Sequence, residues 1–356
     1  MRGTNFDMEK LDISIRTASR DDVARILEIF EKAAASQADA IPLDSNRSKL
    51  TVNVMDRDGF DTRDRAAYFQ AVVAETKDVH SKGRKLIVGA ATYHFKYSTW
   101  VGQVVHLGSV AVDQVYQRKG VATKILKYLG KMAVENKFLR ISFEVSDKNE
   151  AAIQLFDKIR AKNLTKEEGW LNFSFTPETV DKIIHSASEP VPDDIVVRRT
   201  EPKDCQSILA FIRDLATFEK MPDGPKLSVA DLQRDGFYKL FPLYLSHVAE
   251  RTDPDTGEKE IIGYSIYFPT YSPHYGKRIH LEDVYVDPRY RSRGVASSIF
   301  QALAKVIFIL HVLYITHTSY LKLIFQTIFH IHNLVLQGKW ILRVHAGVLE
   351  LERGGN

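Results

Sequence analysis

The sequence is almost free of cysteine, with Cys205 the single one among 356 residues. One cysteine excludes an intrachain disulfide and a zinc site built from several cysteines, so the fold must depend on apolar burial alone. A reducing compartment fits this usage, and we expect the protein in the cytoplasm. Cys205 occupies an apolar position of an expected helix, which favours a small buried residue over a catalytic thiol.

A strong charge of one sign is also missing. The 49 Lys and Arg residues nearly balance the 45 Asp and Glu residues and leave a formal net charge of +4. So mild an excess, spread along the chain, predicts no nucleic-acid binding, although it permits a small anionic ligand. Residues 1–10 are polar and charged and lack the apolar core of a signal peptide, so we expect no targeting segment there.

What remains is the composition of an ordinary globular protein. Hydrophobic residues make up 44% of the chain and charged residues 26%. These fractions exclude a disordered, collagen-like or coiled-coil chain. The length suggests about two domains.

The main feature is a repeat at an offset of 174 residues. Residues 110–126 match residues 284–300 with eight identities in 17 positions. The register extends upstream through matching glycine, tyrosine and histidine residues, and the tetrapeptide Arg-Asp-Gly-Phe at 57–60 recurs at 234–237. An ordered series of matches indicates duplication, so we expect two copies of one domain.

Each copy has the pattern of a mixed α and β domain. In the first copy, strand-like runs occur at residues 13–16, 72–75, 87–95 and 104–112. After Ala122, apolar residues recur on one face of a helix. We expect a first domain at 11–185, a Pro-rich linker at 186–194, a second domain at 195–306 and an atypical apolar tail at 307–356.

A glycine turn joins the longest strand of each copy to the next helix. Gly120 and Gly294 lack the Cβ that would block a close approach, and Ala122 and Ala296 keep the first helical turn slim. A helix N-terminus exposes unpaired amides and the positive end of the helix dipole, which together favour phosphate. Because the pattern occurs twice in the same context, it predicts a diphosphate site in each copy.

These motifs resemble a known signature. Residues 117–122 read QRKGVA and residues 291–296 read RSRGVA. Both are similar to the acetyl-coenzyme A motif of the GCN5-related N-acetyltransferase (GNAT) superfamily, and the likeness is greater still to the spermidine/spermine (diamine) and thialysine acetyltransferases. The first copy resembles the back half of that group at residues 143–150, 152–156 and 165–170, and the second resembles the front half at 215–219, 235–237, 264–268 and 280–286.

The resemblance implies two tandem GNAT-like acyl-CoA N-acyltransferase domains of the α/β class, each a twisted mixed sheet with flanking helices, the second incomplete. It implies acetyl-CoA as cofactor, no metal, and direct attack of an amine on the thioester, with acidic groups that attract the amine and relay its proton. The cofactor positions that it implies are Val110, Ala111, Val112, Gln117, Arg118, Lys119, Gly120, Val121, Ala122, Thr123, Asn149, Val284, Tyr285, Val286, Arg291, Ser292, Arg293, Gly294, Val295, Ala296 and Ser297.

The first copy departs from the family at the acceptor site. Gly108 and Ser109 stand where the second copy and the family have an acidic pair. Phe156 stands where the family has a tyrosine that protonates the departing thiolate, and phenylalanine has no proton to give. Glu168 matches a substrate-contacting position of the family, and the competing interpretation is a solvated loop carboxylate. Cofactor binding is therefore expected to outlast amine chemistry in this copy.

The second copy keeps the acids. The resemblance assigns catalysis to Glu282 and Glu219, and substrate binding to Phe218 and Asp283. Because adjacent strand residues point to opposite faces, we expect at most one of Glu282 and Asp283 to face the cleft, and we choose Glu282. The family pattern stops after Val306, so this copy is half a domain.

The tail is poor in charge. Residues 306–321 and 323–337 contain no Asp, Glu, Lys or Arg. Each run is shorter than the roughly 20 residues that span a bilayer, so a membrane segment is the less favoured interpretation, and scattered histidines without carboxylates do not indicate a metal site. The tail could instead bury its apolar surface against a partner or the incomplete domain, or it could come from an error in gene prediction or splicing.

These features together predict an N-acetyltransferase that moves acetyl from acetyl-CoA to a primary amine of a small polyamine, diamine or thialysine-like substrate. The alternative is a catalytically silent acetyl-CoA-binding or dimerisation protein, because neither copy has every expected residue. A protein substrate is less favoured, since no peptide-groove signature is present. The sequence leaves open which amine is used and whether the copies pair with each other or across a homodimer.

Overall fold

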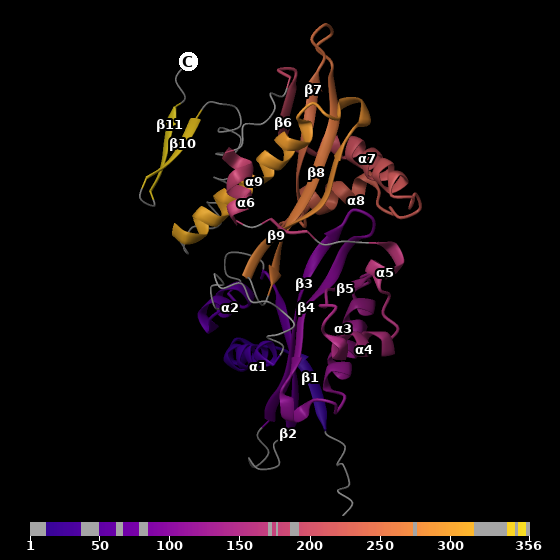
Figure 1. Cartoon of the computed structure of the whole chain (residues 1–356), viewed down its shortest axis with the longest axis vertical. Helices are drawn as coiled ribbons and strands as arrows, with labels where there is room; N and C mark the ends of the chain where they lie inside the picture. The colour runs from indigo at the N-terminus through magenta and orange to yellow at the C-terminus, as the bar shows by residue number, and fades with distance from the viewer. Residues whose placement is uncertain are drawn as a thin grey trace, which may run out of the picture. The chain divides into compact units, whose positions relative to one another are not determined.

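The computed structural model describes residues 12–36, 50–61, 67–77, 85–169, 173–175, 177–185, 192–272, 276–316, 340–345 and 348–353. The alternation of helices and strands confirms the predicted α/β class (Figure 1). In chain order the elements are β1 (Ile13–Thr17), α1 (Val23–Ala35), α2 (Val52–Gly59), β2 (Gln70–Lys77), β3 (Lys85–Ser98), β4 (Gly102–Val112), α3 (Val121–Glu135), β5 (Ile141–Phe143), α4 (Glu150–Lys158), α5 (Leu164–Glu168), α6 (Pro177–His185), β6 (Ile195–Arg199), α7 (Cys205–Phe218), α8 (Val229–Gln233), β7 (Leu245–Thr252), β8 (Lys259–Ser272), β9 (Gly276–Val286), α9 (Val295–Thr316), β10 (Trp340–His345) and β11 (Val348–Arg353).

The chain forms two compact units, and each contains a short segment of the other copy. Unit 1 is drawn from residues 1–96, 103–171 and 270–278, and unit 2 from residues 97–102, 172–269 and 279–356. The exchanged segments are equivalent, because one joins β3 to β4 and the other joins β8 to β9. The expected domain limits, which follow the two copies, stay predictions.

The sheet of unit 1 has the strand order β1-β2-β3-β4-β5. The first three strands pair antiparallel, and β4 pairs with β5 in parallel. Alternate residues of β2 enter different cores, with Val72 packed in a cluster that contains α3 and Val73 in a cluster that contains α1. Because both faces of the sheet are covered by helices, β2 is an almost continuous apolar run.

The sheet of unit 2 repeats this plan with the order β6-β7-β8-β9. Val248 of β7 packs in a cluster with α7, and its neighbour Ala249 packs in a cluster with α9. Among the residues that the structure describes, no fifth strand follows β9 in this sheet. This agrees with the sequence pattern, which ends after Val306.

The same partly buried ion pair occurs in both copies, between Arg16 and Asp22 and between Arg198 and Asp204. The Arg16 guanidinium lies 2.6 Å from the Asp22 carboxylate and holds the pKa of that carboxyl down at about 2. In the second copy the Arg198 guanidinium lies 2.8 Å from the Asp204 carboxylate. Each aspartate also accepts a hydrogen bond from the backbone amide three residues before it. The network therefore fixes the first strand of each copy to the start of the next helix.

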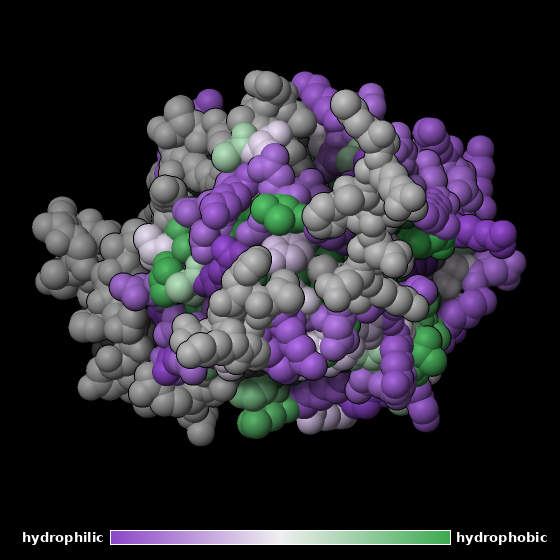
Figure 2. All heavy atoms as spheres, turned by 90° about the horizontal axis from the view of Figure 1, so that it is seen from below, coloured by the Kyte–Doolittle hydropathy of each residue, from purple (hydrophilic) through white to green (hydrophobic). Residues whose placement is uncertain are grey.

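Apolar side chains gather inside each unit. Cys205 is fully buried at the first residue of α7, and burial raises the pKa of its thiol to about 11. This confirms the prediction of a buried, unreactive cysteine. On the face drawn in Figure 2 the described residues are mostly hydrophilic, and hydrophobic ones occur in small separate groups.

Part of the atypical tail has regular structure. Helix α9 continues without a break past Val306 to Thr316. β10 and β11 pair antiparallel as a separate two-stranded sheet. No helix in the described ranges combines the length and the apolar character that crossing a membrane requires. Residues 317–339 of the tail, and most of the linker at 186–194, lie outside the described residues.

The close approach of β8 and β9 generates a stability prediction. A Cβ on Gly263 would lie 2.8 Å from the Tyr285 carbonyl oxygen, so Gly263→Ala must displace backbone and is expected to lower the stability by about 1–3 kcal/mol. The control is Gly130→Ala in α3, where no atom lies within 4 Å, and a gain of roughly 0.5–1 kcal/mol is expected from helix propensity. Thermal unfolding of the full chain measures both, and equal melting temperatures for the two variants would contradict the packing described.

Candidate active site

The two glycine turns have the same backbone conformation. Gly120 and Gly294 have φ values of 79° and 74°, and the residues two places earlier, Arg118 and Ser292, have φ values of 62° and 59°. A left-handed backbone is uncommon for residues other than glycine. Its recurrence at Arg118 and Ser292 therefore indicates that the turn requires this conformation. Successive amides in such a turn form a concave surface that suits an anion.

The first residue of each motif braces the turn. The Gln117 side chain donates from Nε2 to the Val112 carbonyl oxygen at 3.2 Å. Arg291 does the same from Nε to the Val286 carbonyl oxygen at 2.9 Å. Each side chain therefore ties its turn back to the end of the preceding strand. We assigned both residues to the cofactor by resemblance, and this structural role was not visible in the sequence.

The start of the following helix leaves amides available. The Lys124 amide donates to the Gly120 carbonyl at 3.0 Å, and the Ser298 amide donates to the Gly294 carbonyl at 3.0 Å. The amides of the residues between each such pair therefore have no acceptor within the helix. Gly120 is exposed, and no atom lies within 4 Å of the place where its Cβ would be. The open turn and its amides fit a diphosphate.

Basic side chains flank both turns in equivalent places. Lys119 lies over the Tyr116 ring, with 5.4 Å from Nζ to the ring centroid. Arg293 lies over the Tyr290 ring, with 5.7 Å from Cζ to the centroid. In each copy a tyrosine of the short turn after the strand thus holds a cation beside the glycine.

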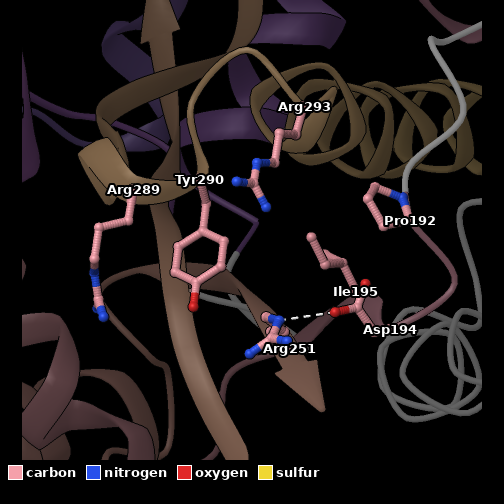
Figure 3. Close-up of a pocket in the computed structure, with 7 residues that line it drawn as sticks. All are labelled: Pro192, Asp194, Ile195, Arg251, Arg289, Tyr290 and Arg293. Atoms are coloured by element: carbon pink, nitrogen blue, oxygen red, sulfur yellow. Dashed lines mark hydrogen bonds and ion pairs between the residues drawn. The ribbon is translucent and has the colours of Figure 1, made fainter. Parts of the chain in front are cut away.

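The second turn borders an arginine-rich hollow of about 340 Å³. Figure 3 shows Arg251, Arg289 and Arg293 around the Tyr290 ring, with Asp194 opposite. Arg251 is paired with Asp194 at 2.7 Å, and Arg289 is paired with Asp287 and Glu260. The residues that line the hollow include three arginines and one aspartate, and Arg251 and Arg289 are each paired with carboxylates.

The strand before each turn changes the face that its residues present. Leu107 and Val110 both pack in the cluster that contains α3, although strict alternation would place them on opposite faces. Leu281 and Val284 repeat this, because each packs against a cluster that contains α9 residues. The two residues between them are Gly108 and Ser109 in the first copy and the acidic pair in the second. Strict alternation therefore does not hold at this point of either strand, and the expectation that at most one acid faces the cleft stays a prediction.

The two copies differ at the edge of this strand. In the first copy, β4 pairs with β5 only from Val105 to Leu107, and the described ladder ends there. The rest of β4, which leads to the turn, does not pair with β5. In the second copy β9 is the edge strand of the described sheet. Within the described residues no strand pairs with the other edge of β9.

The acids of the second copy lie together. Glu282 pairs with His280, with 3.3 Å between Oε2 and Nε2. Asp283 is partly buried and accepts a hydrogen bond of 2.9 Å from the Tyr264 hydroxyl. Burial and the neighbouring Glu282 and Glu219 raise the pKa of Asp283 to about 7. Both members of the acidic pair therefore belong to one electrostatic group with Glu219.

Glu219 and Phe218 follow at the end of α7. Burial raises the pKa of Glu219 above its ordinary value. Phe218 is 73% exposed, so its ring is available to a ligand. Tyr264 is the residue that sequence reasoning missed. It lay within a segment quoted for the resemblance, but spacing along the chain gave no sign that its hydroxyl reaches Asp283.

The site residues predicted in the back half of the first copy contact other residues of that copy. Phe156 is buried and stacks on Phe143, with ring centroids 4.0 Å apart. Asn149 caps α4 by accepting a hydrogen bond of 3.1 Å from the Ala152 amide. Glu168 ends α5 and is paired with Lys162 at 2.5 Å, with 18% of its side chain exposed. Cofactor and substrate roles for Asn149 and Glu168 stay predictions.

Both copies match one family model. Residues 42–160 and 211–320 match the acetyltransferase (GNAT) family, which is more than half of the chain. The thialysine N-epsilon-acetyltransferase of Bos taurus is 39% identical over 115 residues, 32% of this chain and 66% of that enzyme. The enzyme of the same name from Mus musculus is 29% identical over 170 residues, 48% of this chain and 95% of that enzyme.

A human protein and a solved structure are also similar to this chain. The spermidine/spermine N(1)-acetyltransferase-like protein 1 of Homo sapiens is 33% identical over 180 residues, 50% of this chain and 24% of that protein. The chain thus spans slightly less than two thirds of the bovine enzyme and about a quarter of the human protein. A possible acetyltransferase from Clostridium difficile 630 is similar over 46% of this chain and 97% of its own, with 18% identity and a TM-score of 0.36.

The turn geometry predicts how coenzyme A binding responds to substitution. Gly120→Ala adds a Cβ at a left-handed residue in front of the free amides, so we expect about tenfold weaker binding of coenzyme A, measured by calorimetry. Gly257→Ala is the control, because Gly257 is also left-handed, with φ 73° and open space around it, but lies in the turn between β7 and β8. It should lower the melting temperature comparably and leave the affinity unchanged. Equal affinities for the Gly120→Ala variant, a Gly294→Ala variant and the unaltered chain would contradict the assignment.

Proposed function

Because the chain belongs to the acetyltransferase (GNAT) family, we propose that it transfers acetyl from acetyl-CoA to a primary amine of a small polyamine, diamine or thialysine-like molecule. The observation that carries this is the grouping of Glu282, Asp283 and Glu219 beside the strand that leads into the second glycine turn. A negative group of this kind attracts a cationic amine. The relatives named for thialysine and spermidine/spermine acetylation support the choice of amine.

The acids would also remove the proton of the amine. An alkylammonium group is almost fully charged at neutral pH and must lose a proton before it attacks a thioester. With a pKa of about 7, Asp283 can accept a proton at neutral pH, which suits a general base. We assign Glu282 and Glu219 to binding and proton relay beside it, and the exposed Phe218 ring to contact with the carbon chain of the amine.

The donor would lie along the strand and its turn. When bound, acetyl-CoA supplies the acetyl thioester. The amides that follow Gly120 and Gly294 would hold its diphosphate, and Lys119 and Arg293 would add charge. The strand ends at residues 110–112 and 284–286 would offer backbone groups to the pantetheine arm, and a strand amide would stabilise the charge that develops on the carbonyl oxygen.

A second candidate function is a catalytically silent acetyl-CoA-binding or dimerisation protein. It is favoured by the division of features between the copies. The first copy has a parallel strand, β5, beside β4 but has Gly108 and Ser109 in place of acids. The second has the acids but, in the described residues, no strand beside β9. Cytoplasmic location and a homodimeric assembly belong to both candidates as expectations.

Turnover of single variants separates the two candidates. We expect the full chain to release thiol from acetyl-CoA in the presence of spermidine, putrescine or thialysine. Glu282→Gln and Asp283→Asn should each lower kcat/KM by roughly 100-fold or more and leave coenzyme A affinity unchanged. Glu258→Gln, which alters an exposed carboxylate of the turn between β7 and β8, is the matched control and should behave as the unaltered chain.

The contradicting outcomes are distinct. Coenzyme A binding without turnover of any of the three amines would select the silent protein. Full turnover in both the Glu282→Gln and Asp283→Asn variants would show that the reaction does not need these acids, although the chain would still be an acetyltransferase.

A further inference from the structure

A buried tyrosine connects the core of unit 2 to the acidic group. Tyr264 lies in β8 and is 0% exposed. Its hydroxyl donates to Oδ2 of Asp283, on the neighbouring strand β9, at 2.9 Å. Its ring packs in an apolar cluster with α7 residues and lies nearly parallel to the Phe211 ring, with 6.2 Å between the centroids. The packed ring therefore holds the hydroxyl in place beside the carboxylate.

This hydrogen bond restricts a side chain that would otherwise rotate. The last torsion of an aspartate has broad energy wells, so a carboxylate without a fixed partner takes many orientations. The bond from Tyr264 fixes Oδ2 of Asp283 and thereby the direction in which the other carboxylate oxygen points. Burial and the neighbouring Asp283 raise the pKa of Tyr264 well above its ordinary value, so the hydroxyl keeps its proton at neutral pH. It is therefore a donor over the range in which Asp283 titrates.

The charged groups that act on Asp283 are acidic. Glu282 precedes it on β9 and is paired with His280, and Glu219 follows the end of α7. Burial and these two glutamates raise the pKa of Asp283, whereas the hydrogen bond from Tyr264 lowers it. A hydroxyl donor is thus the kind of neighbour that stabilises an ionised carboxylate within this acidic group.

The two partners of the hydrogen bond also occur together in the repeat. At the offset of 174 residues, Tyr264 corresponds to Ala90 and Asp283 corresponds to Ser109. The second copy has both the hydroxyl and the carboxylate, and the first copy has neither. This favours a role of the tyrosine that depends on the acid.

From this arrangement we infer that Tyr264 is a positioning residue for Asp283 in the amine site of the second copy, an inference that rests on the proposed function. The Tyr264 hydroxyl orients the carboxylate and favours its ionised form. Asp283 can then receive a proton from the ammonium group of the substrate near neutral pH. Tyr264 keeps its own proton in this step.

The test removes the hydroxyl and keeps the ring. Tyr264→Phe leaves the apolar contacts of the ring in place, so the variant is expected to fold. Without the donor, Asp283 should titrate about one pH unit higher, and the acid limb of the kcat/KM profile should move with it. Activity of the full chain with acetyl-CoA and spermidine should then fall about tenfold more at pH 6 than at pH 9.

Tyr97→Phe is the matched control. Tyr97 packs in the same apolar cluster as Tyr264 and is 1% exposed. Its hydroxyl has no hydrogen-bond partner in the described chain. Tyr97→Phe should therefore leave the acid limb where it lies in the unaltered chain.

A second readout does not depend on turnover. Asp283 keeps its proton to higher pH in the folded chain than in the unfolded chain, so its contribution to stability falls as pH rises from about 4 to about 7. The difference in unfolding free energy between each chain and its Asp283→Asn derivative isolates this contribution. In the Tyr264→Phe background the fall should extend about one pH unit higher, whereas Tyr97→Phe should leave it in place.

The outcomes separate the inference from the function beneath it. If no amine is acetylated, the proposed function fails, and the unfolding measurement still decides whether Tyr264 acts on Asp283. If Tyr264→Phe leaves the unfolding difference where it was, or if Tyr97→Phe moves it equally, the inference is overturned whatever the activity. If the unfolding difference moves in an active chain but the acid limb does not, the hydrogen bond has no part in catalysis and the positioning role is overturned.

Discussion

The proposed cofactor site of each copy depends on a backbone conformation that occurs twice, the left-handed turn that connects a strand to a helix. A left-handed residue followed two places later by a left-handed glycine reverses the chain within a few residues, as at Arg118 and Gly120. The side chain of the first motif residue, Gln117 or Arg291, ties the turn to the strand end. The helix then begins with its amides facing outward. The turn is the place that we propose for the diphosphate of acetyl-CoA, and without it an amine bound by the acids of the second copy would have no acetyl donor beside it.

The second constraint is the change of face within the strand before the turn. Alternation would send adjacent residues to opposite sides of the sheet, but Leu281 and Val284 pack on the same side. The shift occurs at Glu282 and Asp283 and, in the first copy, at Gly108 and Ser109. The strand before the turn, β4 or β9, therefore has the same irregularity in both copies, but only the second copy has the acidic pair Glu282 and Asp283 there.

Much of the fold could be predicted from sequence because it depends on local patterns. The strands, the helix after each glycine turn and the burial of Cys205 follow from periodicity and from the repeat, and the structure confirms them. What the sequence could not show depends on contacts between distant residues. The exchange of the tip segments and the hydrogen bond from Tyr264 to Asp283 cannot be recognised from the spacing of residues along the chain. The face shift was missed because the alternation rule assumes a regular strand.

The central claim is that the turns bind the diphosphate of coenzyme A. Calorimetry of the full chain with acetyl-CoA and with acetyl-pantetheine, which lacks the nucleotide and its phosphates, tests this most directly. Charge-assisted hydrogen bonds from the turn amides predict that acetyl-CoA binds at least about 100-fold more tightly than acetyl-pantetheine. Equal affinities for the two thioesters, or no heat with either, would contradict the claim.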